Sequence, residues 1–104
     1  MKSLLIIPLA ILALLAPLNA SADFGKGVAA YASGEYATAA KEFKKAAEQG
    51  DGFAQFNLGI MYDNGKGVIQ DNAYAHAWSN IAASEGHKNA KKNRDIIAKK
   101  MTPV

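Results

Sequence analysis

The chain has 104 residues, no cysteine and a formal net charge of +3. This length is enough for one domain and for no more. The lack of cysteine excludes disulfide bonds and a lipid-modified cysteine, so a domain of this size has to be stabilised by packing alone.

The first 22 residues have the three-part layout of a secretory signal peptide. Met1-Lys2-Ser3 is positively charged, the next 15 residues from Leu4 to Leu18 carry no charge, and Ala20-Ser21-Ala22 offers the small residues that a signal peptidase reads. The alternative is an uncleaved membrane anchor, but the apolar run is shorter than the roughly 20 residues that span a bilayer. We therefore expect cleavage after Ala22, a periplasmic or secreted protein, and no stable membrane insertion afterwards.

The rest of the chain is predicted to be all-α, because Ala, Lys, Glu, Gln and Leu dominate its segments and glycines separate them. Asp51 and Asp71 stand where a side-chain oxygen caps a helix N-terminus. Gly50 and Gly86 stand where a left-handed residue ends a helix. Five helices are expected, over residues 24–32, 36–49, 53–63, 72–85 and 88–101.

An internal repeat relates the second and fourth of these helices. The segment ending Ala46-Ala47-Glu48-Gln49-Gly50 recurs 36 residues later as Ala82-Ala83-Ser84-Glu85-Gly86. Upstream the offset falls to 31 residues, so the second unit has about five extra residues in its loop. The predicted units are a degenerate first hairpin (23–50), a complete hairpin (51–87) and a basic helix that begins a third (88–104).

The third predicted helix is apolar on two sides, and only Gln55, Gly59 and Asp63 form a narrow polar strip. A helix in a lone hairpin buries one stripe, so two apolar sides predict neighbours on both sides, as in a stack of hairpins. Gly59 inside a helix costs about 1 kcal/mol relative to alanine, so we expect it to permit a close helix–helix approach.

The fourth and fifth predicted helices are each expected to bury one face. In the fourth helix, His76 and Ser79 fall on the polar side, and the packing face is formed by Tyr74, Ala75, Trp78, Ile81 and Ala82. In the fifth helix, the expected buried stripe is Ala90, Ile97 and Met101.

One long motif resembles a complete Sel-one-like repeat (SLR), a relative of the tetratricopeptide repeat. It consists of Ala54-Gln55-Phe56-Asn57-Leu58-Gly59-Ile60-Met61-Tyr62, then Asn64-Gly65-Lys66-Gly67-Val68, then Asp71, Ala75, Trp78, Ala82-Ala83 and Gly86. The resemblance implies an α/α superhelix (solenoid) of helical hairpins. It also implies an adaptor that binds other proteins on a groove, with the first helix of each hairpin lining the concave face.

We therefore expect an exported, non-catalytic protein–protein interaction module without cofactor or metal, and export disfavours nucleic acid as a partner. The alternative is a cell-envelope enzyme or binder acting on β-lactam or peptidoglycan-type ligands. Certain secreted relatives act on β-lactams, but those relatives carry cysteine pairs in each repeat. His76 and His87 lack further zinc ligands, and the pair of His76 and Ser79 lacks oxyanion donors.

Two groups of residues are candidates for partner binding. The first is a groove on the third helix formed by Phe53, Phe56, Ile60 and Asp63, although both phenylalanines could instead be buried between repeats. The second is an anionic-partner patch in the basic C-terminal helix, formed by Lys88, Lys91, Lys92, Arg94, Lys99 and Lys100. The alternative for this patch is a solvated helix face.

The C-terminal helix is also a candidate site of self-association. Residues 23–87 carry five lysines and eight acidic residues, whereas residues 88–104 carry five lysines, Arg94 and a single acid. Because stacks of fewer than three repeats are rarely self-sufficient, we expect this helix to be covered by a partner or a second copy.

Overall fold

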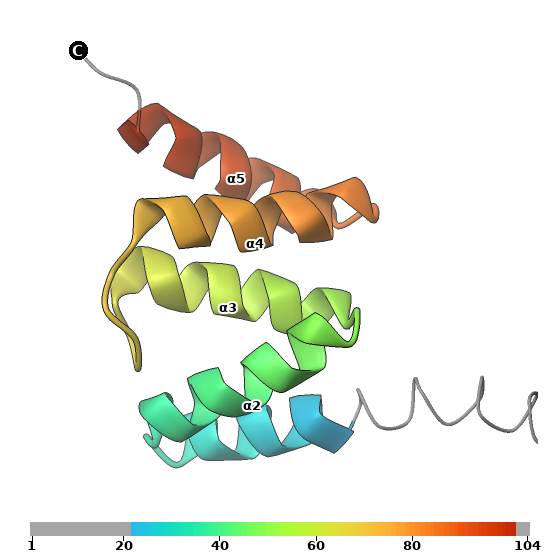
Figure 1. Cartoon of the computed structure of the whole chain (residues 1–104), viewed down its shortest axis with the longest axis vertical. Coiled ribbons are helices and arrows are strands. Elements are labelled where there is room, and N and C mark those ends of the chain that lie inside the picture. Colours follow the sequence, from blue (N-terminus) through green and yellow to red (C-terminus); the bar gives the residue numbers. More distant parts are fainter. Residues whose placement is uncertain (1–21, 102–104) are drawn as a thin grey trace, which may run out of the picture.

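The computed structural model describes residues 22–101, and all the regular structure in this range is helical. A first helix covers residues 22–32 and is followed by α2 (Tyr36–Glu48), α3 (Gly52–Asn64), α4 (Asn72–Ser84) and α5 (Lys88–Met101). Consecutive helices pack side by side as antiparallel hairpins (Figure 1). The predicted all-α repeat fold with five helices is confirmed.

The segment that carries the predicted signal peptide, residues 1–22, lies outside the described residues except for Ala22. None of the helices within residues 22–101 combines the length and the hydrophobicity that crossing a bilayer requires.

The recurring Ala-Ala-x-x-Gly segments end α2 and α4 with the same pair of hydrogen bonds. In the first, the N–H groups of Gly50 and Asp51 each donate to an alanine carbonyl at 3.0 Å; in the second, Gly86 and His87 do so at 3.0 and 3.2 Å. Gly50 and Gly86 have φ angles of 96° and 99°, a region that costs other L-residues roughly 1–2 kcal/mol. The repeated sequence therefore forms the same turn at the ends of α2 and α4.

Helices α3 and α4 each begin with an aspartate cap. The Asp51 side chain accepts from the backbone N–H of Ala54 at 3.1 Å, and the Asp71 side chain accepts from that of Tyr74 at 3.0 Å. Each cap satisfies an N–H group that the first helical turn leaves unpaired. Both predicted caps are confirmed.

The contacts between helices are made largely by small side chains. The larger core residues include Phe43, Leu58, Met61 and Ile97. Helix α3 lies between α2 and α4 and also contacts α5, as its two apolar sides predicted. The alanines that are fully inaccessible to solvent come from four helices: Ala39, Ala46, Ala54, Ala75, Ala82 and Ala90.

Helices α3 and α4 approach each other closely at Gly59. A Cβ atom at this position would lie 2.6 Å from Ser79 Oγ and 3.3 Å from the carbonyl oxygen of Ala75. The expected role of Gly59 is therefore confirmed, but the placement of Ser79 on the polar side of α4 was wrong. Ser79 is fully buried because its small side chain fits against the glycine.

Three further burial predictions on α4 and α5 were wrong. Tyr74 and Ile81 are 57% and 40% exposed, and Met101 is 44% exposed. The fully buried strip of α4 is narrow and consists of Ala75, Ser79 and Ala82, with Trp78 packed beside it against the core. Tyr74 and Ile81 lie outside this strip and stay at the surface.

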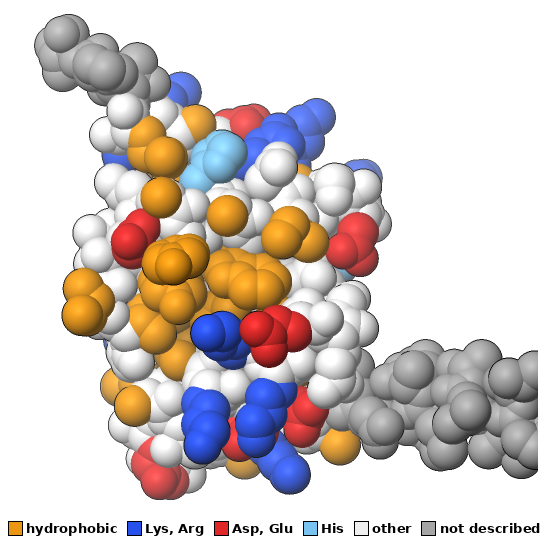
Figure 2. All heavy atoms as spheres, viewed as in Figure 1, with side chains coloured by type: hydrophobic (Ala, Val, Ile, Leu, Met, Phe, Trp, Pro, Cys, Tyr) orange, Lys and Arg blue, Asp and Glu red, His pale blue; other side chains and the backbone are white. Residues whose placement is uncertain are grey.

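The polar strip of α3 is also buried in part. Gln55 is only 2% exposed, and its Nε2 donates to the carbonyl oxygen of Ala47 at 3.2 Å. Figure 2 shows hydrophobic side chains across the middle of one face, with a basic and an acidic side chain beside them and further lysine and arginine side chains toward its two ends.

The substitution Gly59→Ala tests the close approach of α3 and α4. Overpacking against Ser79 costs about 1–3 kcal/mol, and the better helix propensity of alanine returns about 1 kcal/mol, so we expect a net loss of up to about 2 kcal/mol. Urea unfolding followed by circular dichroism measures it. The control is Gly25→Ala in the first helix, where an added Cβ meets nothing within 4 Å and stabilises the protein. Equal stabilisation by both substitutions would contradict the predicted contact.

Candidate functional site

A pocket of about 390 Å³ lies on one side of α3 and is called here the α3 pocket. Its walls come from the first helix, α2, α3 and the start of the α3–α4 loop. Nine residues line it: Val28, Tyr31, Ala32, Phe43, Asn57, Ile60, Met61, Asn64 and Lys66.

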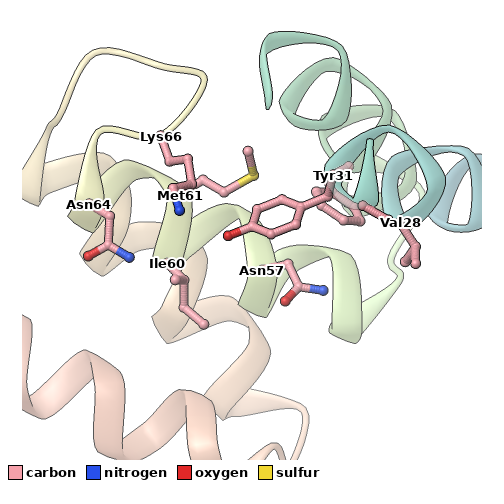
Figure 3. A pocket seen from close by; sticks show the side chains of 9 residues that line it. Val28, Tyr31, Asn57, Ile60, Met61, Asn64 and Lys66 are labelled. Atoms are coloured by element: carbon pink, nitrogen blue, oxygen red, sulfur yellow. The ribbon is translucent and has the colours of Figure 1, made fainter. Parts of the chain in front are cut away.

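The α3 side of the pocket combines apolar and amide side chains. Asn57, Ile60, Met61 and Asn64 are spaced three or four residues apart, so they share one side of the helix. Figure 3 shows Asn57, Ile60 and Asn64 on the same side of α3, with Tyr31 reaching toward them from the first helix. Neither amide side chain has a hydrogen-bond partner within residues 22–101. Both amides are therefore available to a ligand.

Lys66 supplies the pocket with a positive charge. Its Nζ lies 4.8 Å from the ring centroid of Tyr36 and 5.7 Å from that of Tyr31. The two tyrosine rings meet edge to face at 4.9 Å. The backbone of Lys66 is fixed too, because its N–H donates to the carbonyl oxygen of Met61 at 3.0 Å.

The loop that carries Lys66 is anchored on the start of α2. Gly67 has a φ angle of 77°, and a Cβ atom there would overlap the carbonyl group of Tyr36. Val68 packs against the hydrophobic core, and the backbone N–H of Asp71 donates to the carbonyl oxygen of Tyr62 at 3.0 Å. The Gly65-Lys66-Gly67 segment is a turn with positive φ at both glycines, and its second glycine also permits this contact.

The predicted groove residues fall along one side of α3, but the pocket includes only one of them. Ile60 lines the pocket. Phe53, at the start of the helix, is 63% exposed, and its ring centroid lies 6.2 Å from that of Phe24 and 5.1 Å from that of His87. Phe56 is half-buried, and Asp63 is bound to Lys100 at 2.8 Å. The alternative of burial between repeats is wrong for Phe53.

The residues of the predicted basic patch on α5 differ in their exposure and in their partners. Lys88, Lys91, Lys92 and Lys99 are exposed, and Lys100 pairs with Asp63 across to α3. Arg94 donates to Asn80 at 3.1 Å and forms an ion pair with Asp95 at 3.1 Å. Exposed pairs of this kind contribute about 0–1 kcal/mol each. The binding of an anionic partner by this patch stays a prediction.

The sequence-based prediction missed Tyr31, Asn57, Asn64 and Lys66. One signal was available, because Asn57-x-x-Ile60 on α3 recurs as Asn93-x-x-Ile96 on α5 at the same 36-residue offset as the alanines. Ile96 is 55% exposed. Asn57, Ile60 and Asn93 are half-buried, so none of the four recurring residues belongs to the buried core. Their recurrence indicates a shared, partly exposed surface.

The histidines and Ser79, which the sequence offered as candidate metal ligands or catalytic residues, lie in different surroundings in the structure. Within residues 22–101, no group of three or more His, Cys, Asp or Glu side chains converges to hold a metal ion. His87 packs against Phe53, and Ser79 is fully buried three residues after His76. The hydroxyl of Ser79 is therefore closed to a substrate.

The substitution Gly67→Ala tests the anchoring of the loop on α2. Both Gly67 and Gly34 have φ near 80°, but an added Cβ at Gly34 meets nothing within 4 Å. We expect Gly34→Ala to cost about 1–2 kcal/mol from backbone strain alone, and Gly67→Ala to cost about 2 kcal/mol more. Thermal unfolding of the two variants measures the difference. Equal losses would show that the loop does not rest on α2.

Comparison with protein families matches residues 43–51 and residues 52–87 to the Sel1 repeat. The longer match contains α3, the anchored loop and α4, and so includes most of the residues that form the α3 side of the pocket. Comparison with curated proteins and with solved structures gave no match. With its helical hairpins, repeated turn and family match, the chain carries Sel1-like repeats over residues 43–87.

Proposed function

We propose that this protein is an exported, non-catalytic adaptor that holds an extended segment of a protein partner in the α3 pocket. Sel1 repeats are typically protein-interaction modules, which supports a protein partner. The observation that carries the proposal is the α3 pocket itself, in which an apolar lining is combined with two unpartnered amides.

The amide spacing suits an extended chain. Asn57 and Asn64 are two helical turns apart, roughly 10.5 Å along the axis of α3. An extended polypeptide covers this distance in about three residues. Each asparagine side chain both donates and accepts, so it can pair with a backbone C=O and N–H group. The apolar lining between the amides then accepts a side chain of the bound segment.

Helix α5 carries a similar pair of an asparagine and an isoleucine. Asn93 and Ile96 repeat Asn57 and Ile60, and a buried amide nitrogen of Asn93 has no hydrogen-bond partner among the described residues. Adjacent packed helices lie roughly 8–10 Å apart, so a bound segment of a few residues can reach both. The rival hypothesis of an envelope enzyme has no comparable support, because Ser79 is buried.

Export is supported by the layout of the first 22 residues. We expect the mature protein to begin at Asp23, as measured by mass spectrometry of the N-terminal peptide from the native host. The substitution Ala22→Leu places a large side chain where the peptidase requires a small one and is expected to block processing. Asn19→Gln, outside those positions, serves as the control. An unprocessed wild-type N-terminus would contradict cleavage.

Site-specific photocrosslinking tests the binding surface. A photoreactive amino acid is placed at Ile60, at Ile96 or at Ile81, which is 40% exposed on α4 and serves as the matched control. We expect the same protein partner to be crosslinked in cells from positions 60 and 96 and not from 81, because only the first two flank the repeated amides. Crosslinking from position 81 alone would contradict the proposal.

A further inference from the structure

Lys66 is the only charged residue among those that line the α3 pocket. Within residues 22–101, no carboxylate lies within ion-pair distance of its Nζ. Asp63, the acidic residue of α3, is already paired with Lys100 at 2.8 Å. The pocket therefore presents a positive charge that the described part of the chain does not neutralise.

This charge is also held in place. The loop backbone is fixed by the hydrogen bond from Lys66 to Met61 and by the contact of Gly67 with α2. The faces of Tyr31 and Tyr36 attract the ammonium group and keep it near the pocket. A positioned charge loses less side-chain entropy on binding than a freely rotating lysine does.

We infer that the α3 pocket selects a partner segment in which an apolar side chain stands within about two residues of a carboxylate. The apolar side chain enters between Tyr31, Ile60 and Met61, and the carboxylate pairs with Lys66. The carboxylate is an Asp or Glu side chain or the C-terminus of the partner. This inference rests on the proposed function and adds to it the chemistry of the bound segment.

Charge complementarity makes the pocket specific for a segment that carries a carboxylate. Lys66 is exposed, so a carboxylate of the bound segment can reach its ammonium group beside the two tyrosine rings. A basic residue at the same place of the segment would be repelled by Lys66 and excluded. The affinity of an acidic segment is then expected to fall as the salt concentration rises.

The test begins with a display library of random nonapeptides selected on the immobilised full chain. Binders that also bind the Ile60→Asp chain are discarded, because they do not depend on the pocket. We expect the remaining peptides to share a Leu, Ile, Met, Phe or Tyr with an Asp or Glu, or a free C-terminus, within two residues of it. Pocket-dependent peptides without a nearby carboxylate would overturn the inference and leave the proposed function standing.

Fluorescence anisotropy then measures one selected peptide and its Asp→Asn or Glu→Gln form. We expect Lys66→Met to weaken the binding of the acidic peptide about tenfold and to leave that of the amide form unchanged. Lys66→Arg retains the charge and stays within about twofold, and Lys92→Met, an exposed lysine of α5, has no effect. Equal weakening of both peptides by Lys66→Met would overturn the pairing.

Two further outcomes separate the inference from the proposed function and from a folding defect. If no pocket-dependent peptide is selected, the proposed function fails and the inference fails with it. If Lys66→Met lowers the unfolding temperature, a peptide with lysine in place of the acid is measured on the wild-type chain. More than tenfold weaker binding of that peptide supports the inference, and unchanged binding overturns it.

Discussion

The helices of this protein lie close together because alanine, glycine and serine occupy most of the contacts between them. Gly59 and Ser79 bring α3 against α4, and a column of buried alanines continues the contact toward both ends of the stack. Tyr62 of α3 adds an aromatic contact with Tyr74 of α4, their ring centroids 5.1 Å apart. Ile60 and Met61 lie on another side of α3 and line the pocket.

The loop between α3 and α4 links the stability of the stack to the chemistry of the pocket. It joins the first hairpin to the second through Gly67 and Val68, which rest on α2 and on the core. The same contacts set the position of Lys66 above Tyr31 and Tyr36. A substitution that loosens the loop is therefore expected to alter partner binding as well as the stability of the fold. This holds even though the loop backbone itself need not contact the partner.

The sequence predicted the local features well, because their causes are local. Aspartate caps and glycine stops act within four or five residues, and the ends of α2 to α5 agree with prediction within one residue. Burial on α4 was predicted less well. Helical periodicity assigns Ser79 to the polar side, and only the glycine that faces it from α3 reverses that assignment. Burial at this position is a property of two helices, not of one.

The α3 pocket was harder to predict for the same reason. It joins Tyr31 of the first helix, Ile60 of α3 and Lys66 of the loop, and no single helical period connects these residues. The predicted groove identified the correct helix and one pocket residue, Ile60. The recurrence of asparagine and isoleucine on α3 and α5 was the only sequence signal for the remaining surface.

Isoleucine-methyl NMR of the full chain tests directly whether a partner binds along α3. The titrant is the partner segment identified by crosslinking. We expect shifted methyl signals for Ile60 and Ile96, and unchanged signals for Ile69 and Ile81. Ile69 and Ile81 are 90% and 40% exposed and do not line the pocket. Shifts at Ile69 or Ile81 with an unchanged Ile60 would contradict it.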